Sequence, residues 1–395
     1  RSSDLLFGTG TAFQAISIFP ESLDSDREKE VLRYIKYLEP FTEIYVFKTF
    51  NTSFLIISTD RKEIRTAMGR LLEEQENPDS VLYKCNVIHI ANASVLHDQK
   101  TLLDFIDYTN AKMSKYLKNH YLDVTEEAIE SYIRHDLIKD EIVAALEEDR
   151  VEVFFQPIYS FSKQHFSSAE ALVRIRKKDG SLLSPGLFIP IAETHGLISE
   201  IGERVFEKTC LMLQTTPARL YGLEYVEVNL SVLQCEQKTL ADRMISIMEA
   251  YSISPSWINL EITETVFVDF STQESRQNAV QIVDGLRNMG FTVSMDDFCT
   301  GYSSIAMLEN LSVDIMKIDR AMLLGAARSE RGRLLLGIVV NMGHSMGMQV
   351  LCEGIEEQEQ ETLLIENGCM LGQGFLYKKP MPAEEFFRFL DAGGG

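Results

Sequence analysis

The sequence predicts an α/β protein in which a closed (β/α)8 barrel of the TIM type follows a smaller α+β domain. The 395 residues suffice for two domains, each with its own core. After Val151, eight strand-like runs recur over about 240 residues, and helical patterns separate most of them, which is typical of a barrel. A doubly wound open sheet is the alternative. We expect a domain at 1–122, a helical linker at 123–149 and the barrel at 150–392.

The net charge of −21 argues against binding to a nucleic acid polymer or to an anionic membrane surface. Six scattered cysteines without a CxxC pair indicate reduced thiols, as in a cytoplasmic protein. No apolar run reaches the roughly 18 residues that span a membrane, and no signal peptide is visible. Because the chain begins with Arg1, we also consider that it is the cytoplasmic part of a longer, membrane-anchored protein.

The first domain mixes strand and helix patterns, which is typical of an α+β fold. The strand patterns lie at 13–19, at 44–58 as a hairpin turning near 50–53, and at 87–91; the helical patterns lie at 26–38, 64–72 and 101–118. His89 and His97 stand alone, so we interpret them as structural. Residues 125–148 then carry apolar side chains at helical spacing after Thr125, which predicts a linker helix; a coiled-coil signalling helix is the alternative.

The barrel region alternates strands with helices. Strands are predicted at 151–158, 167–175, 225–230, 258–262, 292–295, 314–318, 349–352 and 370–377. Helices are predicted at 199–213, 240–251, 273–289, 328–346 and 358–367.

Polar side chains recur at or near the ends of these strands. They are Glu170, Asn229, Glu261, Asp296 with Asp297, Lys317, Glu353 and Gln373. Any one of them has a structural explanation, such as a satisfied buried acid or a turn residue. Because the carboxyl ends of barrel strands meet on one face, the repeated feature instead predicts a site there. Asp296 and Asp297 are adjacent, so they share that site only where their strand gives way to a loop.

The residue types indicate the chemistry. Carboxylate and amide oxygens without His or Cys favour Mg²⁺ or Mn²⁺ over Zn²⁺. Such cations polarise a phosphoryl oxygen and lower the pKa of a bound water, and two of them clamp the oxygens of an in-line displacement. We find no Ser-His-Asp set and no cysteine nucleophile beside a histidine. Hydrolysis of an anionic substrate is therefore the expected reaction class.

Several motifs in order resemble the EAL domain family, the cyclic di-GMP phosphodiesterases. They are EALVR at 170–174, FQPI at 155–158, FIPIAE at 188–193, VNLS at 228–231, EITET at 261–265, DDFCTGYSS at 296–304, KIDR at 317–320, EGIE at 353–356 and QGF at 373–375. The resemblance covers about Phe155 to Pro382 and implies hydrolysis of cyclic di-GMP to linear pGpG. It also implies a homodimer through the EAL domain.

The resemblance assigns roles to these residues. The first divalent cation would be bound by Glu170, Asn229, Glu261 and Asp296, and Asp297 would help to hold a second. Glu353 would be the general base, Lys317 would position the attacking water, Gln373 would orient water or metal, and Glu264 would hold the 296–304 loop. Gln156, Glu170, Leu172, Arg174 and Asp297 would contact the substrate. The cations would be Mg²⁺ or Mn²⁺, with Ca²⁺ inhibitory.

Two departures concern activity. Cys299 stands where the family usually has Gly, which would cost about 1–2 kcal/mol if the backbone needs a positive φ. The first domain resembles a degenerate GGDEF domain: Thr49–Ile57 sits where the signature hairpin would be, without its acids and glycines, so we predict no diguanylate cyclase activity. The leading hypothesis is a metal-dependent phosphodiesterase regulated by this domain. The alternatives are a receptor that binds cyclic di-GMP without cleaving it and a protein-interaction module.

Overall fold

The computed structural model describes residues 7, 11–20, 25–37, 44–49, 53–83, 85–116, 120–215, 221–235, 237, 239–263, 273–298 and 312–393. The chain divides into two compact units, Arg1–Leu137 and Ile138–Gly395. The division falls inside the predicted linker, and the exact domain boundaries stay a prediction. No helix in the described ranges is both long and apolar enough to cross a membrane.

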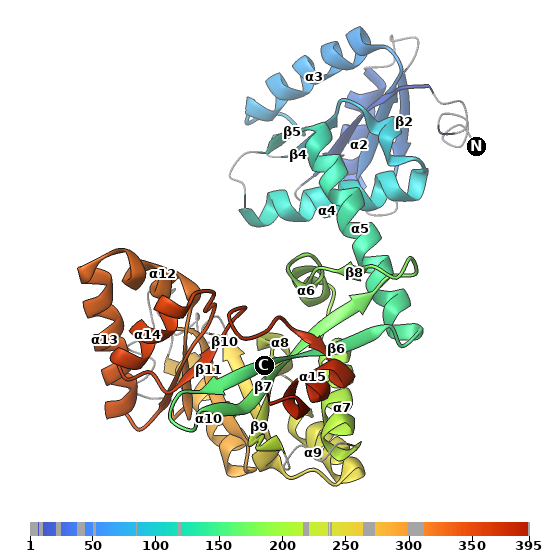
Figure 1. The fold of residues 1–395 in the computed structure, drawn as a ribbon. Helices are drawn as coiled ribbons and strands as arrows, with labels where there is room; N and C mark the ends of the chain where they lie inside the picture. The colour runs from blue at the N-terminus through green and yellow to red at the C-terminus, as the bar shows by residue number, and fades with distance from the viewer. Residues whose placement is uncertain are drawn as a thin grey trace. The chain divides into compact units, whose positions relative to one another are not determined.

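The first unit contains a five-stranded sheet with the order β2-β3-β1-β4-β5 (Figure 1). The strands are β1 (Gln14–Phe19), β2 (Ile44–Lys48), β3 (Phe54–Ser58), β4 (Asn86–Ile90) and β5 (Tyr121–Val124). Neighbours are antiparallel except β4 and β5, which are parallel. The predicted hairpin is confirmed, with Ile44 opposite Ser58; residues 50–52 of its turn lie outside the described ranges.

Helices pack on both faces of this sheet because successive strand residues point to opposite sides. The helices are α2 (Ser25–Tyr37), α3 (Arg61–Glu76) and α4 (Gln99–Tyr116), with the short η1 (Ala93–Leu96). Ile16 belongs to the core with Val31 of α2 and Ile64 of α3. Its neighbour Ala15 belongs to the opposite core with Phe105 of α4. The predicted strands and helices of this unit are confirmed, and β5 is an addition.

Helix α5 (Glu126–Glu147) confirms the helix predicted at 125–148. Its first half contributes Ile129 and Ile133 to the first unit's core. Its second half contributes Ile142 and Leu146 to the core of the second unit. The helical spacing of these apolar residues therefore reflects packing on two cores.

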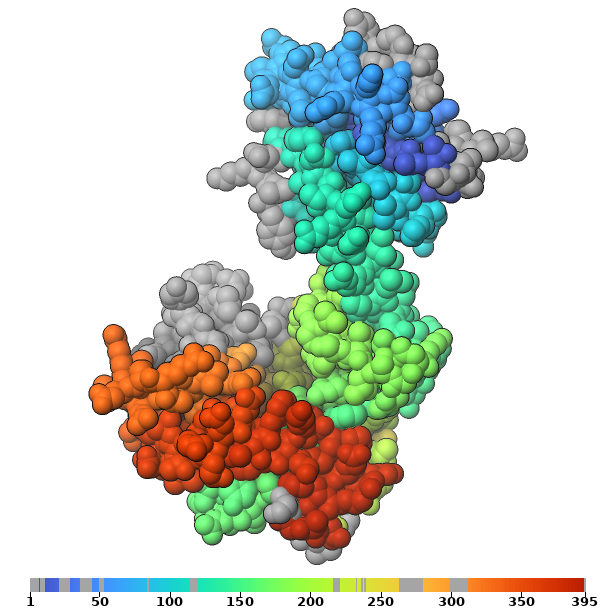
Figure 2. Space-filling view, turned by 45° about the horizontal axis from the view of Figure 1, so that its top comes forward, coloured from blue at the N-terminus to red at the C-terminus, as the bar shows by residue number. Residues whose placement is uncertain are grey.

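The second unit is a closed eight-stranded barrel with outer helices (Figure 1). On the surface of this unit, residues late in the chain (orange to red) lie beside residues of the first barrel strands (green; Figure 2). Its strands are β6 (Val151–Ser160), β7 (His165–Arg176), β9 (Tyr225–Leu230), β10 (Ile258–Thr263), β11 (Thr292–Phe298), β12 (Ile315–Ile318), β13 (Gln349–Cys352) and β14 (Leu371–Gln373). The two-residue strands β8 (Leu182–Leu183) and β15 (Met381–Pro382) extend it. The barrel closes because β6 pairs with both β7 and β14.

The helices of this unit confirm the five predicted and add others. They are α6 (Pro185–Thr194), α7 (Ile198–Thr215), α8 (Val232–Cys235), α9 (Leu240–Tyr251), η3 (Pro255–Trp257), α10 (Gln273–Asn288), α12 (Arg320–Arg328), α13 (Glu330–Ser345), α14 (Gln358–Glu366) and α15 (Ala383–Asp391). Ser329 separates α12 from α13, and its Oγ accepts a hydrogen bond from the Gly332 N–H at 3.0 Å. This cap explains why the second helix starts where it does.

The first strand departs from a uniform (β/α)8 repeat. β6 runs antiparallel to β7 and to β14, whereas the other barrel neighbours are parallel. Residues 161–164 join β6 to β7, with Gln164 at φ 56°. A parallel partner would require a crossover of a dozen or more residues, so this connection permits only a hairpin.

Candidate active site

The barrel interior changes from apolar to polar along the strands. One layer consists of Ile158, Tyr225, Ile315, Leu351 and Leu371. Residues two further along several strands are polar: Glu227 follows Tyr225, Lys317 follows Ile315, and Gln373 follows Leu371. Since side chains alternate along a strand, these residues face the same interior. The apolar layer closes the barrel beneath the polar one.

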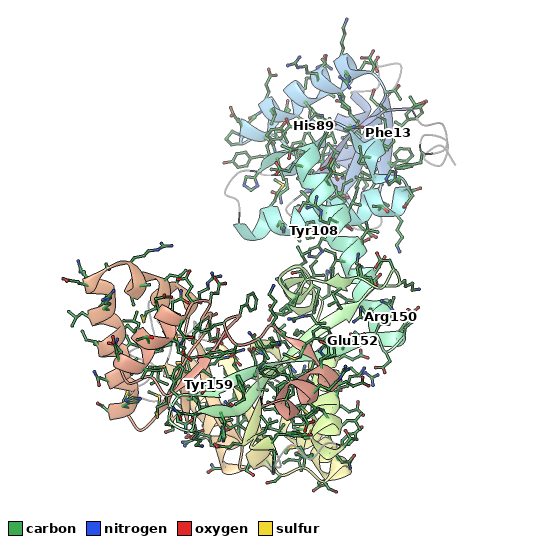
Figure 3. The ribbon with its side chains drawn as sticks, viewed as in Figure 1. Phe13, His89, Tyr108, Arg150, Glu152 and Tyr159 are labelled. Carbon is green, nitrogen blue, oxygen red and sulfur yellow. The ribbon has the colours of Figure 1, made fainter. Side chains whose placement is uncertain are left out.

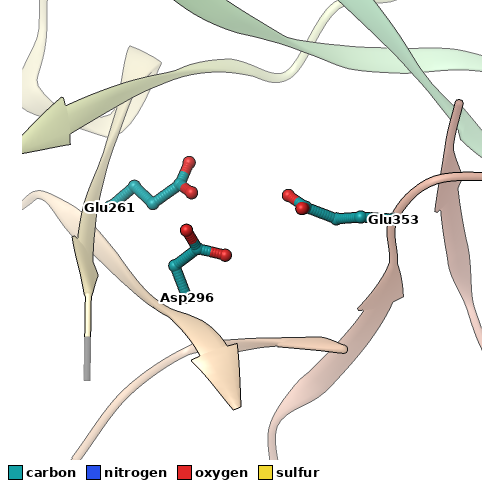
Figure 4. Close-up of side chains that lie close together, drawn as sticks. All are labelled: Glu261, Asp296 and Glu353. Atoms are coloured by element: carbon teal, nitrogen blue, oxygen red, sulfur yellow. The ribbon is translucent and has the colours of Figure 1, made fainter. Parts of the chain in front are cut away.

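Three carboxylates meet at one end of the barrel (Figure 4). Glu261 of β10, Asp296 of β11 and Glu353, which follows β13, each offer an oxygen, and these oxygens lie within 4.8 Å of one another. We call these residues the acid cluster. The Glu353 N–H donates to the Ile318 carbonyl at 3.0 Å, which ties the end of β13 to β12. The structure thus groups Glu353, the expected base, with two expected metal ligands.

Lys317 lies completely buried in contact with this cluster. Its Nζ is 2.6 Å from Glu261 Oε1, 2.6 Å from Glu353 Oε1 and 3.3 Å from Glu227 Oε2. Burial would lower the pKa of Lys317, but the surrounding carboxylates, Glu170 first among them, outweigh it and raise that pKa. Lys317 therefore stays an ammonium ion and is the counter-ion of the site.

Burial acts on the acids of the cluster in the direction opposite to its effect on Lys317. Burial raises the pKa of Glu261 and the pKa of Glu353, the latter to about 7, and Lys317 opposes both shifts. Glu353 keeps 26% of its side chain exposed, whereas Glu261 keeps 1%. Glu353 is thus the acid of this pair that solvent reaches.

Glu170 is the centre of a second polar group. Its two carboxylate oxygens accept hydrogen bonds from Asn229 Nδ2 at 2.9 Å and from Gln373 Nε2 at 2.7 Å. Gln373 Nε2 also donates to Gln156 Oε1 at 3.1 Å. Gln156 lies opposite Glu170 because β6 and β7 pair in that register. The reversed first strand is what brings Gln156 to this end of the barrel.

Asp296 and Asp297 occupy a break in the ladder between β11 and β12. Met295 pairs with Met316 and Phe298 with Ile318, so the two acids form a bulge, and Asp297 has φ 55°. The two acids were expected where their strand gives way to a loop, but β11 continues to Phe298 and the irregularity lies within the ladder. Asp296 belongs to the acid cluster and Asp297 does not. The role of Asp297 at a second cation therefore stays a prediction.

Two cavities open beside these groups and share Glu170 and Leu172. One, of about 360 Å³, also reaches Gln156, Gln373 and the acid cluster. The other, of about 310 Å³, is mostly apolar and reaches Arg174, Ile189, Val205 and Leu230. The Arg174 guanidinium lies 5.6 Å from the centre of the Phe154 ring. Of the expected substrate residues, Gln156, Glu170, Leu172 and Arg174 line one or both cavities, and Asp297 lines neither.

Two glycines allow the loops after β13 and β14 to approach one another. A Cβ at Gly374 would lie 2.0 Å from the Ile355 carbonyl oxygen. Gly354 has φ 68°, and a Cβ there would lie 2.5 Å from Arg320 Cγ. The Ile355 N–H donates to the Gln373 carbonyl at 3.1 Å. This contact positions Glu353 and Gln373 relative to each other.

The donor set fits a hard divalent cation. Among the described residues, Glu261 Oε2 is buried without a hydrogen-bond partner, beside oxygens of Asp296 and Glu353. An unpartnered buried carboxylate oxygen is costly unless a cation or proton satisfies it. The oxygen-only ligands suit Mg²⁺ or Mn²⁺.

The remaining residues singled out in the sequence lie outside this site or outside the described ranges, and two buried polar residues were not predicted. Glu264 and Cys299 lie outside the described ranges. His89 bonds to Asp123 at 2.8 Å and lies in the first unit (Figure 3), in keeping with a structural role. Sequence reasoning missed Glu227 and Asn259, which are both completely buried. The sequence did contain a signal for them: Glu227 lies two residues before Asn229, and Asn259 lies two residues before Glu261, so each shares a strand face with an expected ligand.

These features define a class, the closed α/β barrels with an acid-lined site at the carboxyl ends of their strands. The chain belongs to the EAL domain family, which matches residues 139–380. It is 32% identical over 246 residues to the signaling protein YkoW of Bacillus subtilis, and 31% identical over 254 residues to the cyclic di-GMP phosphodiesterase NbdA of Pseudomonas aeruginosa.

The matched regions cover 62% and 64% of this chain but only 30% and 32% of those relatives. Among solved structures, the PaMucR phosphodiesterase in complex with c-di-GMP is 31% identical, with a TM-score of 0.59. The match covers 63% of this chain and 99% of that one. The EAL family and its barrel fold are thus shown for residues 139–380.

Proposed function

We propose that the second unit hydrolyses cyclic di-GMP to linear pGpG with the help of divalent cations. The observation that carries the proposal is the acid cluster, with Lys317 buried beside it. The relatives named as cyclic di-GMP phosphodiesterases support the choice of substrate. In the reaction one water adds to phosphorus and the bond from phosphorus to the 3′ oxygen breaks. The products are a 5′-phosphate and a 3′-hydroxyl on one linear molecule.

The cations would be held by Glu170, Asn229, Glu261 and Asp296, with Asp297 at a second position. When bound, Mg²⁺ or Mn²⁺ would polarise the phosphoryl group and make water a better nucleophile. Glu353 accepts the proton of the attacking water, because its pKa is raised to about 7 and its side chain reaches the cavity. Gln373 holds Glu170 through its amide group.

Lys317 acts through the carboxylates. It is completely buried, and its three nearest acceptors are oxygens of Glu227, Glu261 and Glu353. The ammonium ion therefore orients Glu261 and Glu353 and offsets their repulsion. Its direct contact with the attacking water stays a prediction.

The two cavities accommodate the two chemical parts of the substrate. The cavity with the acid cluster receives the scissile phosphodiester, and the apolar cavity beside Arg174 receives a guanine base. Leu172 lies between them and contacts both. Arg174 carries the positive charge that an anionic substrate needs at this rim. Gln156, held in place by Gln373, completes the wall.

We also propose that the first unit regulates the barrel and has no cyclase activity. The segment Thr49–Ile57 contains no acid to hold a metal and no glycine to admit a phosphate. Incubation with GTP and Mg²⁺ should yield no cyclic di-GMP. Formation of the cyclic product would refute this part of the proposal.

Product analysis with cyclic di-GMP and Mg²⁺ or Mn²⁺, with and without EDTA, tests the function. We expect pGpG only when the cation is present. Binding without cleavage, supported by Ca²⁺, would identify a receptor, with Cys299 as the first position to revert to glycine. Absence of any binding would identify a protein-interaction module.

A further inference from the structure

Glu227 is a completely buried acid for which the proposed reaction has no role. It lies on β9, two residues before Asn229, and pairs in register with Glu170 of β7 and with Asn259 of β10. A buried carboxylate is costly unless hydrogen bonds and an opposite charge compensate it. Its contacts therefore indicate what it does.

The two oxygens of Glu227 face different groups. Oε1 accepts a hydrogen bond from Asn259 Nδ2 at 3.0 Å. Oε2 lies 3.3 Å from Lys317 Nζ as an ion pair and has no hydrogen-bond partner among the described residues. Glu227 is thus a partner of Lys317 and not a member of the acid cluster.

Lys317 donates a hydrogen bond to Glu261 Oε1 at 2.6 Å and pairs with two further acids. An ammonium group has three N–H bonds, and three carboxylates, those of Glu227, Glu261 and Glu353, lie within 3.3 Å of its Nζ. If Glu227 carried no charge, the positive charge of Lys317 would fall on Glu261 and Glu353 alone. The carboxylates of Glu261 and Glu353 would then attract a divalent cation less strongly.

We infer that Glu227 is a positioning residue that holds Lys317 in the barrel interior and strengthens divalent-cation binding at the acid cluster. Glu227 acts through its contact with Lys317 and is itself neither a cation ligand nor a substrate contact. The inference rests on the proposed function, because it concerns the cations of that same site.

Titration with Mn²⁺, followed by electron paramagnetic resonance without substrate, tests this role. Glu227→Gln keeps the shape and removes the charge. We expect the same number of bound Mn²⁺ ions and a dissociation constant raised about tenfold, as for other residues that orient metal ligands. The matched control is Glu224→Gln on the same segment, where the acid is 44% exposed and pairs with Lys163. It should keep the wild-type constant.

The outcomes separate the inference from the proposed function. Equal Mn²⁺ affinity in wild type and Glu227→Gln overturns the inference and leaves the proposed function standing. Loss of one bound ion also overturns it, because Glu227 would then be a ligand. If the wild-type protein binds no Mn²⁺, the inference and the proposed metal-dependent function are both refuted.

A second variant covers the case in which Glu227→Gln does not fold. Asn259→Ala removes the donor to Glu227 Oε1 and leaves every other group in place. It should raise the Mn²⁺ dissociation constant by roughly threefold, the effect of one hydrogen bond. An unchanged constant in folded Asn259→Ala overturns the inference.

Discussion

Gly374 shows at the scale of one residue how this site depends on close backbone approach. It follows Gln373 on β14, and a Cβ there would lie 2.0 Å from the Ile355 carbonyl oxygen and 2.3 Å from the Ile355 nitrogen. Backbone atoms cannot turn away as a flexible side chain does. A side chain at 374 therefore has to separate the loop that carries Glu353 from the strand that carries Gln373.

Gly374→Ala should destabilise the protein by about 1–3 kcal/mol, as other overpacked sites do, and should lower turnover further through displacement of Gln373. Urea unfolding and product assays measure the two effects. Gly285→Ala is the matched control, because a Cβ at Gly285 in α10 meets nothing within 4 Å. It should be neutral or stabilising by up to about 1 kcal/mol. Equal stabilities of the two variants would contradict the argument.

Glu353→Gln should lower the rate of pGpG formation by roughly 10² to 10⁴, the usual contribution of a general base. Binding of cyclic di-GMP should remain measurable, since the amide keeps the shape of the side chain. Rapid-quench product analysis and a binding titration give the two quantities. Glu366→Gln, on the exposed side of α14, controls for a change of charge alone. Unchanged turnover would remove Glu353 from the mechanism.

At the scale of the element, α4 is held at its start by Asp98. Its two carboxylate oxygens accept hydrogen bonds from the Thr101 N–H and the Thr101 Oγ1, both at 2.8 Å. These bonds, the backbone one first, lower the pKa of Asp98. A carboxylate at this position satisfies a backbone donor that the first turn of a helix leaves unpaired.

Asp98→Ala should lower the free energy of unfolding by about 1 kcal/mol at neutral pH. Because the folded pKa of Asp98 is lower than the unfolded one, the charge-dependent part of this contribution is complete above the unfolded pKa of about 3.9. It is lost as the pH falls below that value and through the folded pKa. The difference in free energy of unfolding between wild type and variant, measured in urea, should therefore narrow as the pH falls from about 3.9 toward and below the folded pKa. An equal difference at neutral pH and at about pH 3 would contradict this role of the Asp98 carboxylate.

At the scale of the whole molecule, the single helix α5 contributes apolar side chains to a core of the first unit and to the core of the second. The family resemblance predicts that the EAL domain forms a homodimer. Light scattering coupled to size-exclusion chromatography should therefore give twice the mass of one chain. A monomer at micromolar concentration with full turnover would separate activity from assembly.

Most elements follow from local pattern, but their pairing does not. The apolar spacing of 240–251 and of 349–352 predicts α9 and β13 with the bounds that the structure has. The antiparallel course of β6 was missed because strand periodicity is the same in either direction. The short connection at 161–164 was the local signal for a hairpin. The short β5 and helices α6, α12 and α15 were also missed, because an element of so few residues shows only a weak hydrophobic periodicity.

By itself, the sequence determined the barrel class, the family and the strand ends at which the acids lie, because period, motif order and residue type are local properties. Only the tertiary structure decided which of these side chains meet. Closure of the barrel places Glu353 with Glu261 and Asp296, and leaves Glu170 with Asn229 and Gln373. It also sets Glu227 against Lys317. Contacts across a closed barrel depend on the register of all its strands, which no single segment contains.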